Sequence, residues 1–379
     1  SSGPAKIVVH AGAAMQVLVG ASLLVGGLLA LKHRIERPIA HISTGAQRRK
    51  LHPVDKGIGD GAVDVLASKE FSVKRQFHKL RNGEQIFYQT MTAVGKEPTH
   101  ILVFLHGYTS HSDFYLETMA EVARQGCMVV LLDLPCHGRS DGLLCYIPDW
   151  WTWVDKVWEF MDDVVKPLRT VTGKPRKLFL SGMSLGGGLT ACMGVMRPTY
   201  FDGLIPIAPM LLVSDEVKPP LIVQILFRRL LGPFKFTWPV TPSKDLDHVD
   251  FRVPEHGKKF TKVNPLSMFG LKPRVASAIA LGFTFPEWME QNLKGVKSPI
   301  LIMHGVMDKV TDPTMSERLH VEAVAQDKTL KLYEGAYHCE LLCCLPGHEK
   351  LLNVKFLPEQ LAQTTEAIKD MTDWIAARR

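Results

Sequence analysis

The sequence predicts an α/β fold with a mostly parallel central sheet that is flanked by helices. Two observations predict it. Short, continuously apolar runs alternate with helical stretches, which is typical of strands buried on both faces of a parallel sheet. The 379 residues are also 46% hydrophobic and 22% charged, a globular composition that excludes extensive disorder. Together they predict one large domain with an appendage.

The predicted strands begin with a hairpin and continue as buried runs. Residues 71–77 and 84–91 are strand-like, and the Asn82-Gly83 pair between them is a strong hairpin signal. The buried runs follow at residues 100–106, 127–134, 176–182, 202–209, 298–305 and 328–335.

A long interruption separates two parts of this core. Between Met210 and about Lys297 the chain is rich in Pro, Phe, Trp and Leu and shows no run of that type. We therefore predict an inserted helical cap, or lid, over residues 210–297. The core would then comprise residues 71–209 and 298–379.

An apolar run near the N-terminus predicts a transmembrane helix. Residues 11–31 carry no charge, and a helix of this length spans about 31 Å, close to the hydrocarbon thickness of a bilayer. A basic segment follows, so the positive-inside rule predicts a single-pass membrane protein with the remaining chain on the cytoplasmic side. Ser22 and Gly26 form a small-xxx-small pair that could contact a membrane-protein partner. We expect an anchor over residues 1–31 and a linker over residues 32–70.

Charge and cysteine usage exclude other classes. The net charge is +7, but residues 1–50 hold seven basic residues and one acidic residue, so the excess lies beside the apolar run. A nucleic-acid binder would carry a basic face on its folded domain, so no nucleic-acid partner is expected. The seven cysteines are odd in number and scattered, which predicts no disulfide framework. Cys339, Cys343, Cys344 and His348 lack paired zinc spacing, and we predict no metal and no cofactor.

The pentapeptide Gly182-Met183-Ser184-Leu185-Gly186 is the sharpest chemical signal. It directly follows a predicted strand and precedes a helical stretch, the context of a nucleophile elbow. The amino end of that helix offers amide donors, so Leu185 N–H is predicted to bind a developing oxyanion. The alternative is a glycine-rich turn that serves packing alone.

A serine nucleophile needs a base that a third group orients. Asp308 and His338 each follow a predicted strand, in the chain order that this architecture requires after Ser184. Asp312 is the main alternative for the acid, and Asp133 is a more distant one. None of the other histidines follows a last strand in this way.

A second oxyanion donor is predicted after the first long buried run. His106-Gly107-Tyr108 closes that run and matches the loop that supplies such an amide, so the donor would be Tyr108 N–H. We expect His106 and His137 to be hydrogen-bonded structural residues rather than catalysts.

The sequence resembles the monoacylglycerol lipase family of α/β hydrolases, including its plant lysophospholipase-like branch. The matching stretches are FLHGYTSHSDFY, LLDLPCHGRSDGLLCYIPDW, LFLSGMSLGGGLT, IPIAPM, PILIMHGVMDKVTDP and AQDKTLKLYEGAYH. This resemblance spans about residues 75–345 and implies the α/β-hydrolase fold. It also implies Ser184 as nucleophile, Asp308 as acid and His338 as base. Met183 departs from the family, which often has His or Gln there.

These observations predict a membrane-anchored serine hydrolase that cleaves acyl esters at a bilayer. Monoacylglycerol is the leading lipid substrate, with free fatty acid and glycerol as products. A lysophospholipase or another carboxylesterase is the alternative within this class, because the fold hosts many leaving groups. A non-catalytic hydrolase-fold subunit of a membrane complex is the alternative from another class.

Overall fold

The computed structural model describes residues 22, 25–170, 175–212, 220–226, 228–229, 234–241, 249–268 and 271–378. The chain divides into two units, Ser1–His41 and Ile42–Arg379. The second unit holds the sheet and every predicted site residue.

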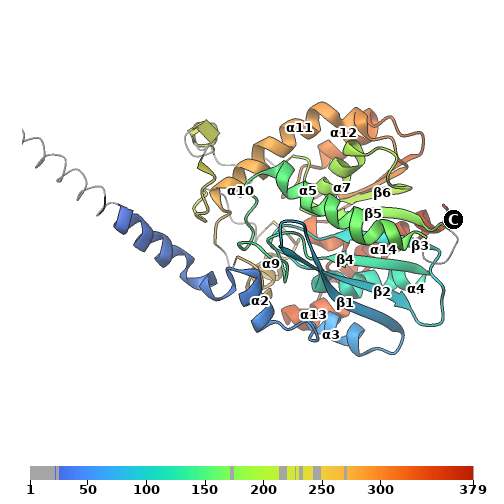
Figure 1. Cartoon of the computed structure of the whole chain (residues 1–379). Coiled ribbons are helices and arrows are strands. Elements are labelled where there is room, and N and C mark those ends of the chain that lie inside the picture. The colour runs from blue at the N-terminus through green and yellow to red at the C-terminus, as the bar shows by residue number, and fades with distance from the viewer. Residues whose placement is uncertain are drawn as a thin grey trace, which may run out of the picture. The chain divides into compact units, whose positions relative to one another are not determined.

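An eight-stranded sheet organises this second unit in the order β1-β2-β4-β3-β5-β6-β7-β8 (Figure 1). The strands are β1 Phe71–Lys79, β2 Gln85–Ala93, β3 His100–Leu105, β4 Cys127–Leu132, β5 Lys177–Met183, β6 Gly203–Ile207, β7 Ile300–Gly305 and β8 Lys328–Tyr333. The pairs β1–β2 and β2–β4 are antiparallel, and the remaining pairs are parallel. The predicted mostly parallel sheet is therefore confirmed. Gly83 takes a φ of 89° in the β1–β2 turn, a conformation that favours glycine.

Helices cover both faces of the sheet (Figure 1). Its longer helices are α4 Leu116–Arg124, α5 Trp150–Phe160, α7 Leu185–Met196, α12 Pro313–Glu322 and α14 Pro358–Ala376. The shorter helices outside the insert are α2 Gly45–Leu51, α3 Asp60–Ala67, α6 Lys166–Leu168 and α13 Pro346–Leu352. Alternate residues of β3 enter two separate cores, one shared with α5, α7 and α12 and the other with α3, α4 and α14. Period-two alternation sends these side chains to opposite faces, so the strand is buried on both.

In its described residues, the insert between β6 and β7 contains helices and loops and no strand. Its α-helices are α8 Leu221–Leu226, α9 Pro254–Val263, α10 Val275–Ile279 and α11 Phe285–Asn292. Its later part belongs to the core, because Phe285 is fully buried and its ring stacks on Trp150 with centroids 4.2 Å apart. By contrast, α8 buries none of its residues.

Residues 42–67 differ from the linker expected over residues 32–70. They form α2 and α3, and Thr44 caps α2 through a reciprocal pair of hydrogen bonds with Gln47. Arg48 is fully buried although it is charged, and its guanidinium donates to backbone carbonyls of the loop after β4. This part of the predicted linker is therefore folded into the second unit, and the linker boundary is corrected. The Gly and Asp content of these residues predicted a linker. The contacts that bury Arg48 come from a loop far along the chain, so composition does not reveal them.

The predicted transmembrane helix over residues 11–31 lies mostly outside the described residues, which include only 22 and 25–31 of that span. The described helix over residues 25–36 continues into charged residues, and Lys32 pairs with Glu36 at 3.9 Å. Within the described ranges, no helix combines the length and apolarity that crossing a bilayer needs. This finding corrects the prediction of a single-pass membrane protein with its remaining chain on the cytoplasmic side.

Candidate active site

Ser184 lies on a sharp turn between β5 and α7. Its backbone has φ 57° and ψ −117°, which costs about 1–3 kcal/mol for a non-glycine residue. Glycines make the turn possible, because a Cβ at Gly186 would overlap the Leu105 carbonyl oxygen. A Cβ at Gly182 would likewise overlap the Gly186 carbonyl. The sequence motif therefore produces the elbow expected from it.

Three backbone hydrogen bonds hold this strained turn. Ser184 N–H donates to Ile207 O at 3.0 Å. Its carbonyl accepts from Gly188 N–H and from Met210 N–H, each at 2.9 Å. Strained residues persist where the surrounding structure over-determines them, and these contacts do so from α7 and from the end of β6.

Asp308 and His338 meet in the loops that follow β7 and β8. His338 Nδ1 lies 2.6 Å from Asp308 Oδ2, and both residues are buried. Burial alone would lower the pKa of His338, but the Asp308 carboxylate and its hydrogen bond outweigh it, so this pKa is raised. Burial alone would raise the pKa of Asp308, but His338 and the hydrogen bond from His304 hold it well below its ordinary value.

Two further side chains orient Asp308. Thr311 donates its hydroxyl to Asp308 Oδ2 at 2.8 Å and its amide to Oδ1 at 3.0 Å. His304 Nε2 lies 3.2 Å from the same Oδ2, while its Nδ1 lies 2.7 Å from Ser316 Oγ. Sequence reasoning missed His304 and Thr311. The only available signal was their spacing of four and three residues from Asp308 along the chain.

The alternative carboxylates serve other contacts. Asp312 caps α12 by accepting from Thr314 N–H at 2.9 Å. Asp133 accepts from the amides of Ser112 at 2.7 Å and Arg139 at 2.6 Å. Of these three aspartates, Asp308 alone bonds His338 among the hydrogen bonds of the described residues.

Gly107 lies beside Ser184, and Tyr108 follows Gly107 in the chain. A Cβ at Gly107 would be 3.4 Å from the Ser184 Cβ, so glycine lets this backbone approach the elbow. In the described part of the chain, the Tyr108 amide donates to no backbone acceptor. Leu185 is the first residue of α7, where amides lack an intrahelical acceptor. Two amides are thus available near the serine.

His106 and His137 are buried in hydrogen-bonded positions. His106 Nε2 accepts from Leu134 N–H at 2.9 Å, so its Nδ1 carries the proton that it donates to Gly107 O at 2.7 Å. His137 Nδ1 lies 3.0 Å from Pro135 O. Burial lowers the pKa of both, to about 3 for His137. Neither imidazole carries charge near neutral pH.

Other chemically capable groups take no part in the hydrogen bonds between Asp308 and His338. Cys339, Cys343 and Cys344 are buried free thiols, and His348 Nε2 lies 3.0 Å from Phe114 O. Among the described residues, one group has ligand atoms close enough to share a metal ion. It comprises His78, Glu159 and Asp163, and includes no predicted site residue.

The structure brings Asp308 to His338 and Gly107 to Ser184. The hydrogen bonds of the described residues include none between the Ser184 side chain and His338. Ser184 stands at the carboxyl end of β5, and Asp308 and His338 follow the carboxyl ends of β7 and β8. These three strands run parallel, so all three residues lie at one edge of the sheet, where α/β folds form their ligand sites.

Residues 96–342 match the family described as serine aminopeptidase, S33. The chain is 29% identical over 304 residues to the caffeoylshikimate esterase of Arabidopsis thaliana, covering 79% of this chain and 84% of that protein. It is 30% identical over 267 residues to the monoacylglycerol lipase of Mycolicibacterium smegmatis, covering 68% of this chain and 86% of that protein.

Solved structures share the fold. A soluble variant of Saccharomyces cerevisiae monoglyceride lipase, in complex with a substrate analog, aligns with a TM-score of 0.62 and 18% identity over 86% of this chain and 98% of that one. Monoacylglycerol lipase of Paleococcus ferrophilus aligns with a TM-score of 0.59 and 22% identity, covering 78% of this chain and 99% of that one.

Proposed function

Because the chain belongs to the hydrolase family described as serine aminopeptidase, S33, and is a carboxylic ester hydrolase of the monoglyceride lipase type, we propose that it cleaves monoacylglycerol through Ser184, His338 and Asp308. The products are a free fatty acid and glycerol. Family membership argues against the alternative of a non-catalytic subunit.

His338 is the proposed general base. Its Nδ1–H donates to Asp308 Oδ2, which leaves Nε2 as the acceptor for the Ser184 hydroxyl proton. Ser184 Oγ then bonds to the ester carbonyl carbon, and the proton on His338 passes to the leaving glycerol oxygen. Water attacks the acyl-enzyme by the same route and releases the fatty acid. Asp308 orients the ring and stabilises its transient charge, and it keeps its own charge because its pKa is depressed.

Tyr108 N–H and Leu185 N–H are the proposed oxyanion donors. The tetrahedral intermediate carries negative charge on the former carbonyl oxygen, and preorganised amides stabilise that charge. The support is that Gly107 approaches the Ser184 Cβ closely and that Tyr108 N–H has no backbone acceptor within the described residues.

The observation that carries this proposal is the buried 2.6 Å contact between His338 Nδ1 and Asp308 Oδ2. Burying a histidine and an aspartate away from water is costly unless the two groups form a strong hydrogen bond with each other. Asp308 receives further hydrogen bonds from Thr311 and His304, which suits an acid whose task is orientation.

We also assign the insert between β6 and β7 as a cap over the acyl site. Two contacts support this assignment. Asn264 Nδ2 donates to Thr109 O at 3.0 Å, next to the proposed oxyanion amide. Ser277 Oγ donates to Cys145 O at 2.9 Å, the same carbonyl that accepts the Tyr108 hydroxyl. The exposed apolar side chains of α8 would contact the acyl chain.

Active-site labelling with a fluorophosphonate tests the nucleophile. We expect covalent modification of the wild-type protein, no modification of Ser184→Ala, and retained modification of Ser181→Ala, the matched control three residues earlier on β5. Labelling that persists in Ser184→Ala would refute the assignment.

A substrate panel then tests the leaving group. It would comprise monoacylglycerol, lysophosphatidylcholine, a hydroxycinnamate ester and a short-chain nitrophenyl ester. The highest kcat/KM on monoacylglycerol supports the proposal. A preference for lysophosphatidylcholine or the hydroxycinnamate ester would keep the mechanism and replace the substrate.

A further inference from the structure

Arg48 is a buried charge whose five N–H groups all find backbone carbonyls. Nη1 donates to Ile42 O and Ser43 O, each at 3.0 Å. Nη2 donates to Ser140 O at 2.6 Å and Gly142 O at 3.2 Å, and Nε donates to Gly138 O. No described carboxylate forms an ion pair with Arg48, and burial lowers its pKa. A guanidinium is the side chain that offers five donors in one plane.

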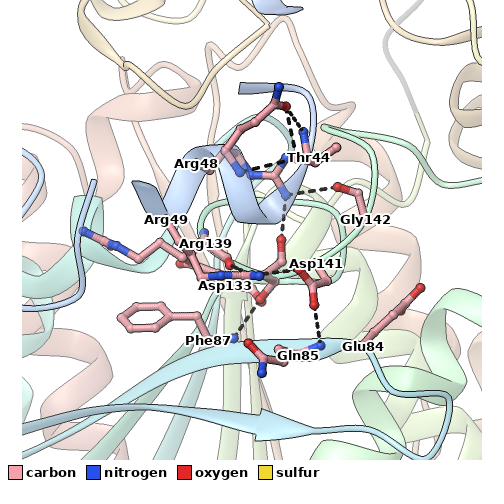
Figure 2. Close-up of polar contacts among 12 residues, drawn as sticks. Thr44, Arg48, Arg49, Glu84, Gln85, Phe87, Asp133, Arg139, Asp141 and Gly142 are labelled. Atoms are coloured by element: carbon pink, nitrogen blue, oxygen red, sulfur yellow. Dashed lines mark hydrogen bonds and ion pairs between the residues drawn. The ribbon is translucent and has the colours of Figure 1, made fainter. Parts of the chain in front are cut away.

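Three of those carbonyls, at residues 138, 140 and 142, belong to the loop over residues 133–145, and Figure 2 shows Arg48 beside Gly142. That loop is held in unfavourable conformations, since Cys136 has φ 67° and Cys145 has φ 53°. Arg49 adds contacts to the same loop, with Nη1 2.9 Å from Arg139 O and 2.8 Å from an Asp141 oxygen. Strained backbone persists only where neighbouring groups over-determine it, and α2 supplies those groups.

The loop over residues 133–145 in turn forms hydrogen bonds with the loop that carries the proposed oxyanion amide. Leu134 N–H donates to His106 Nε2 at 2.9 Å, and His106 Nδ1–H donates to Gly107 O at 2.7 Å. Tyr108 Oη donates to Cys145 O at 2.9 Å. The amide of Ser112 donates to Asp133 Oδ1 at 2.7 Å.

The Gly107 carbonyl and the Tyr108 N–H are parts of one peptide unit. A peptide unit is planar and trans, so the group that fixes its C=O also fixes the direction of its N–H. His106 fixes the Gly107 carbonyl, and Leu134 fixes His106. The direction of the Tyr108 N–H therefore depends on the position of the loop over residues 133–145.

We propose that Arg48 is a positioning residue for the Tyr108 oxyanion amide, acting through the loop over residues 133–145. This inference rests on the proposed function. Arg48 lies outside residues 96–342, the part of the chain that matches the family, whereas the loop that it holds lies inside. Residues 42–58 thus contribute to the chemistry without contacting substrate.

The test compares Arg48→Lys with Arg176→Lys. Arg176 is also buried, and it donates to Pro98 O at 2.9 Å and Leu168 O at 3.1 Å. It directly precedes β5, so it lies at the amino end of the strand, opposite Ser184. Arg176 Nη2 also pairs with Glu97 at 2.6 Å. Lysine has three donors and no planar fork, so each variant loses hydrogen bonds from a buried guanidinium to backbone carbonyls.

The readouts are thermal stability, kcat and KM on p-nitrophenyl butyrate, and the affinity for an alkyl trifluoromethyl ketone. This ketone accepts the serine oxygen at its carbonyl carbon and puts an oxyanion between the two amides. We expect Arg48→Lys to lower kcat about tenfold or more, with KM within about twofold, and to weaken ketone binding in parallel. Arg176→Lys should lose stability and keep kcat and ketone affinity.

A second variant tests the proposal even if Arg48→Lys fails to fold. A Cβ at Gly45 would lie 2.6 Å from an Asp141 side-chain oxygen and 2.7 Å from Ser140 O, so Gly45→Ala shifts α2 against the loop while Arg48 stays. We expect the same pattern with a smaller loss of kcat. Unchanged kcat in a folded Gly45→Ala, or equal losses of kcat in the two lysine variants, would overturn the positioning role.

The relay through His106 gives an independent check. If Arg48 acts through Leu134 and His106, the effects of Arg48→Lys and His106→Gln on ketone affinity should be less than additive in the double variant. Full additivity would overturn the relay. A wild-type protein that hydrolyses no ester would instead refute the proposed function itself, so the two failures are distinguishable.

Discussion

The acid–base side and the oxyanion side of the proposed site differ in how they are held. Asp308 and His338 follow neighbouring parallel strands, β7 and β8, and meet through side chains 2.6 Å apart. The Tyr108 amide belongs to the backbone, and its direction is set through His106 and the loop over residues 133–145, with Arg48 beyond.

Replacing a residue should therefore reduce activity abruptly on the acid–base side and by degrees on the oxyanion side. A charged hydrogen bond between two buried side chains is lost completely when one partner is replaced. A peptide unit that several weaker contacts hold moves only slightly when one contact is lost, because the remaining contacts still restrain it.

Ser184→Ala should have the largest effect, because the serine serves both sides. We expect turnover to fall by about 10⁴-fold or more, with the fold intact, since the triad acts as a unit. The measurement is kcat/KM on p-nitrophenyl butyrate together with the melting temperature. Substantial residual turnover would mean that Ser184 is not the nucleophile.

Asp308→Asn should follow closely. Without its carboxylate the His338 ring loses its orientation, and we expect about a 10³–10⁴-fold loss in kcat. Asp312→Asn is the matched control, because Asp312 caps α12 and is expected to cost stability rather than turnover. If Asp312→Asn proves the more damaging change to kcat, the acid has been wrongly assigned.

The pH profile separates the two sides. His338 must be neutral to accept the Ser184 proton, and its pKa is raised above the ordinary histidine value of about 6.5. We therefore expect kcat/KM to fall as the pH drops through a midpoint above that value. Asp308→Asn removes the group that raises the pKa, so its residual activity should show a lower midpoint. Arg48→Lys acts on the oxyanion side and should leave the midpoint unchanged.

Tyr108→Phe should produce a graded loss. The variant keeps the amide and removes one hydroxyl bond to Cys145 O, which is 2.9 Å long. A hydrogen bond of this kind contributes about 1 kcal/mol, so kcat should fall about threefold to tenfold at constant KM. Tyr146→Phe loses a similar bond to Lys235 O at 2.6 Å and serves as the control. Equal effects of the two variants would contradict the role of Tyr108 in holding its own peptide.

The exposed residues of α8 should have the smallest effect. Leu221 and Ile222 are 70% and 67% exposed, so replacing both with Ser should not destabilise the fold. If the insert caps the acyl site, hydrolysis of a long-chain monoacylglycerol should fall about threefold to tenfold while a butyryl ester is unaffected. Val321→Ser on α12, where Val321 is 73% exposed, is the control. Equal losses on both esters would remove α8 from substrate binding.

Much of the fold was predictable because its signals are local. The apolar runs that became β3 to β8, the Asn82-Gly83 turn and the glycines around Ser184 each reflect a backbone requirement within a few residues. The resemblance to the monoacylglycerol lipase family of α/β hydrolases is confirmed by the match over residues 96–342 and by the named relatives.

Other features depended on segments far apart in the chain. Residues 42–67 of the expected linker are a folded part of the second unit, and the later half of the insert packs Phe285 on Trp150. Neither of these two packing arrangements follows from composition, because a glycine-rich or aromatic-rich stretch has the same composition whether or not it packs on the core.

The amino-acid sequence alone predicted where the strands lie along the chain, the elbow at Ser184 and the candidates for the acid and base. Periodicity and turn chemistry act between near neighbours, so they can be read along the chain. Only the tertiary structure decided that Asp308 rather than Asp312 meets His338, and that Arg48 holds a loop some ninety residues away. Leaving a buried polar or charged group without a hydrogen-bond partner is costly. The partner has to be close in space, and it can come from any part of the sequence.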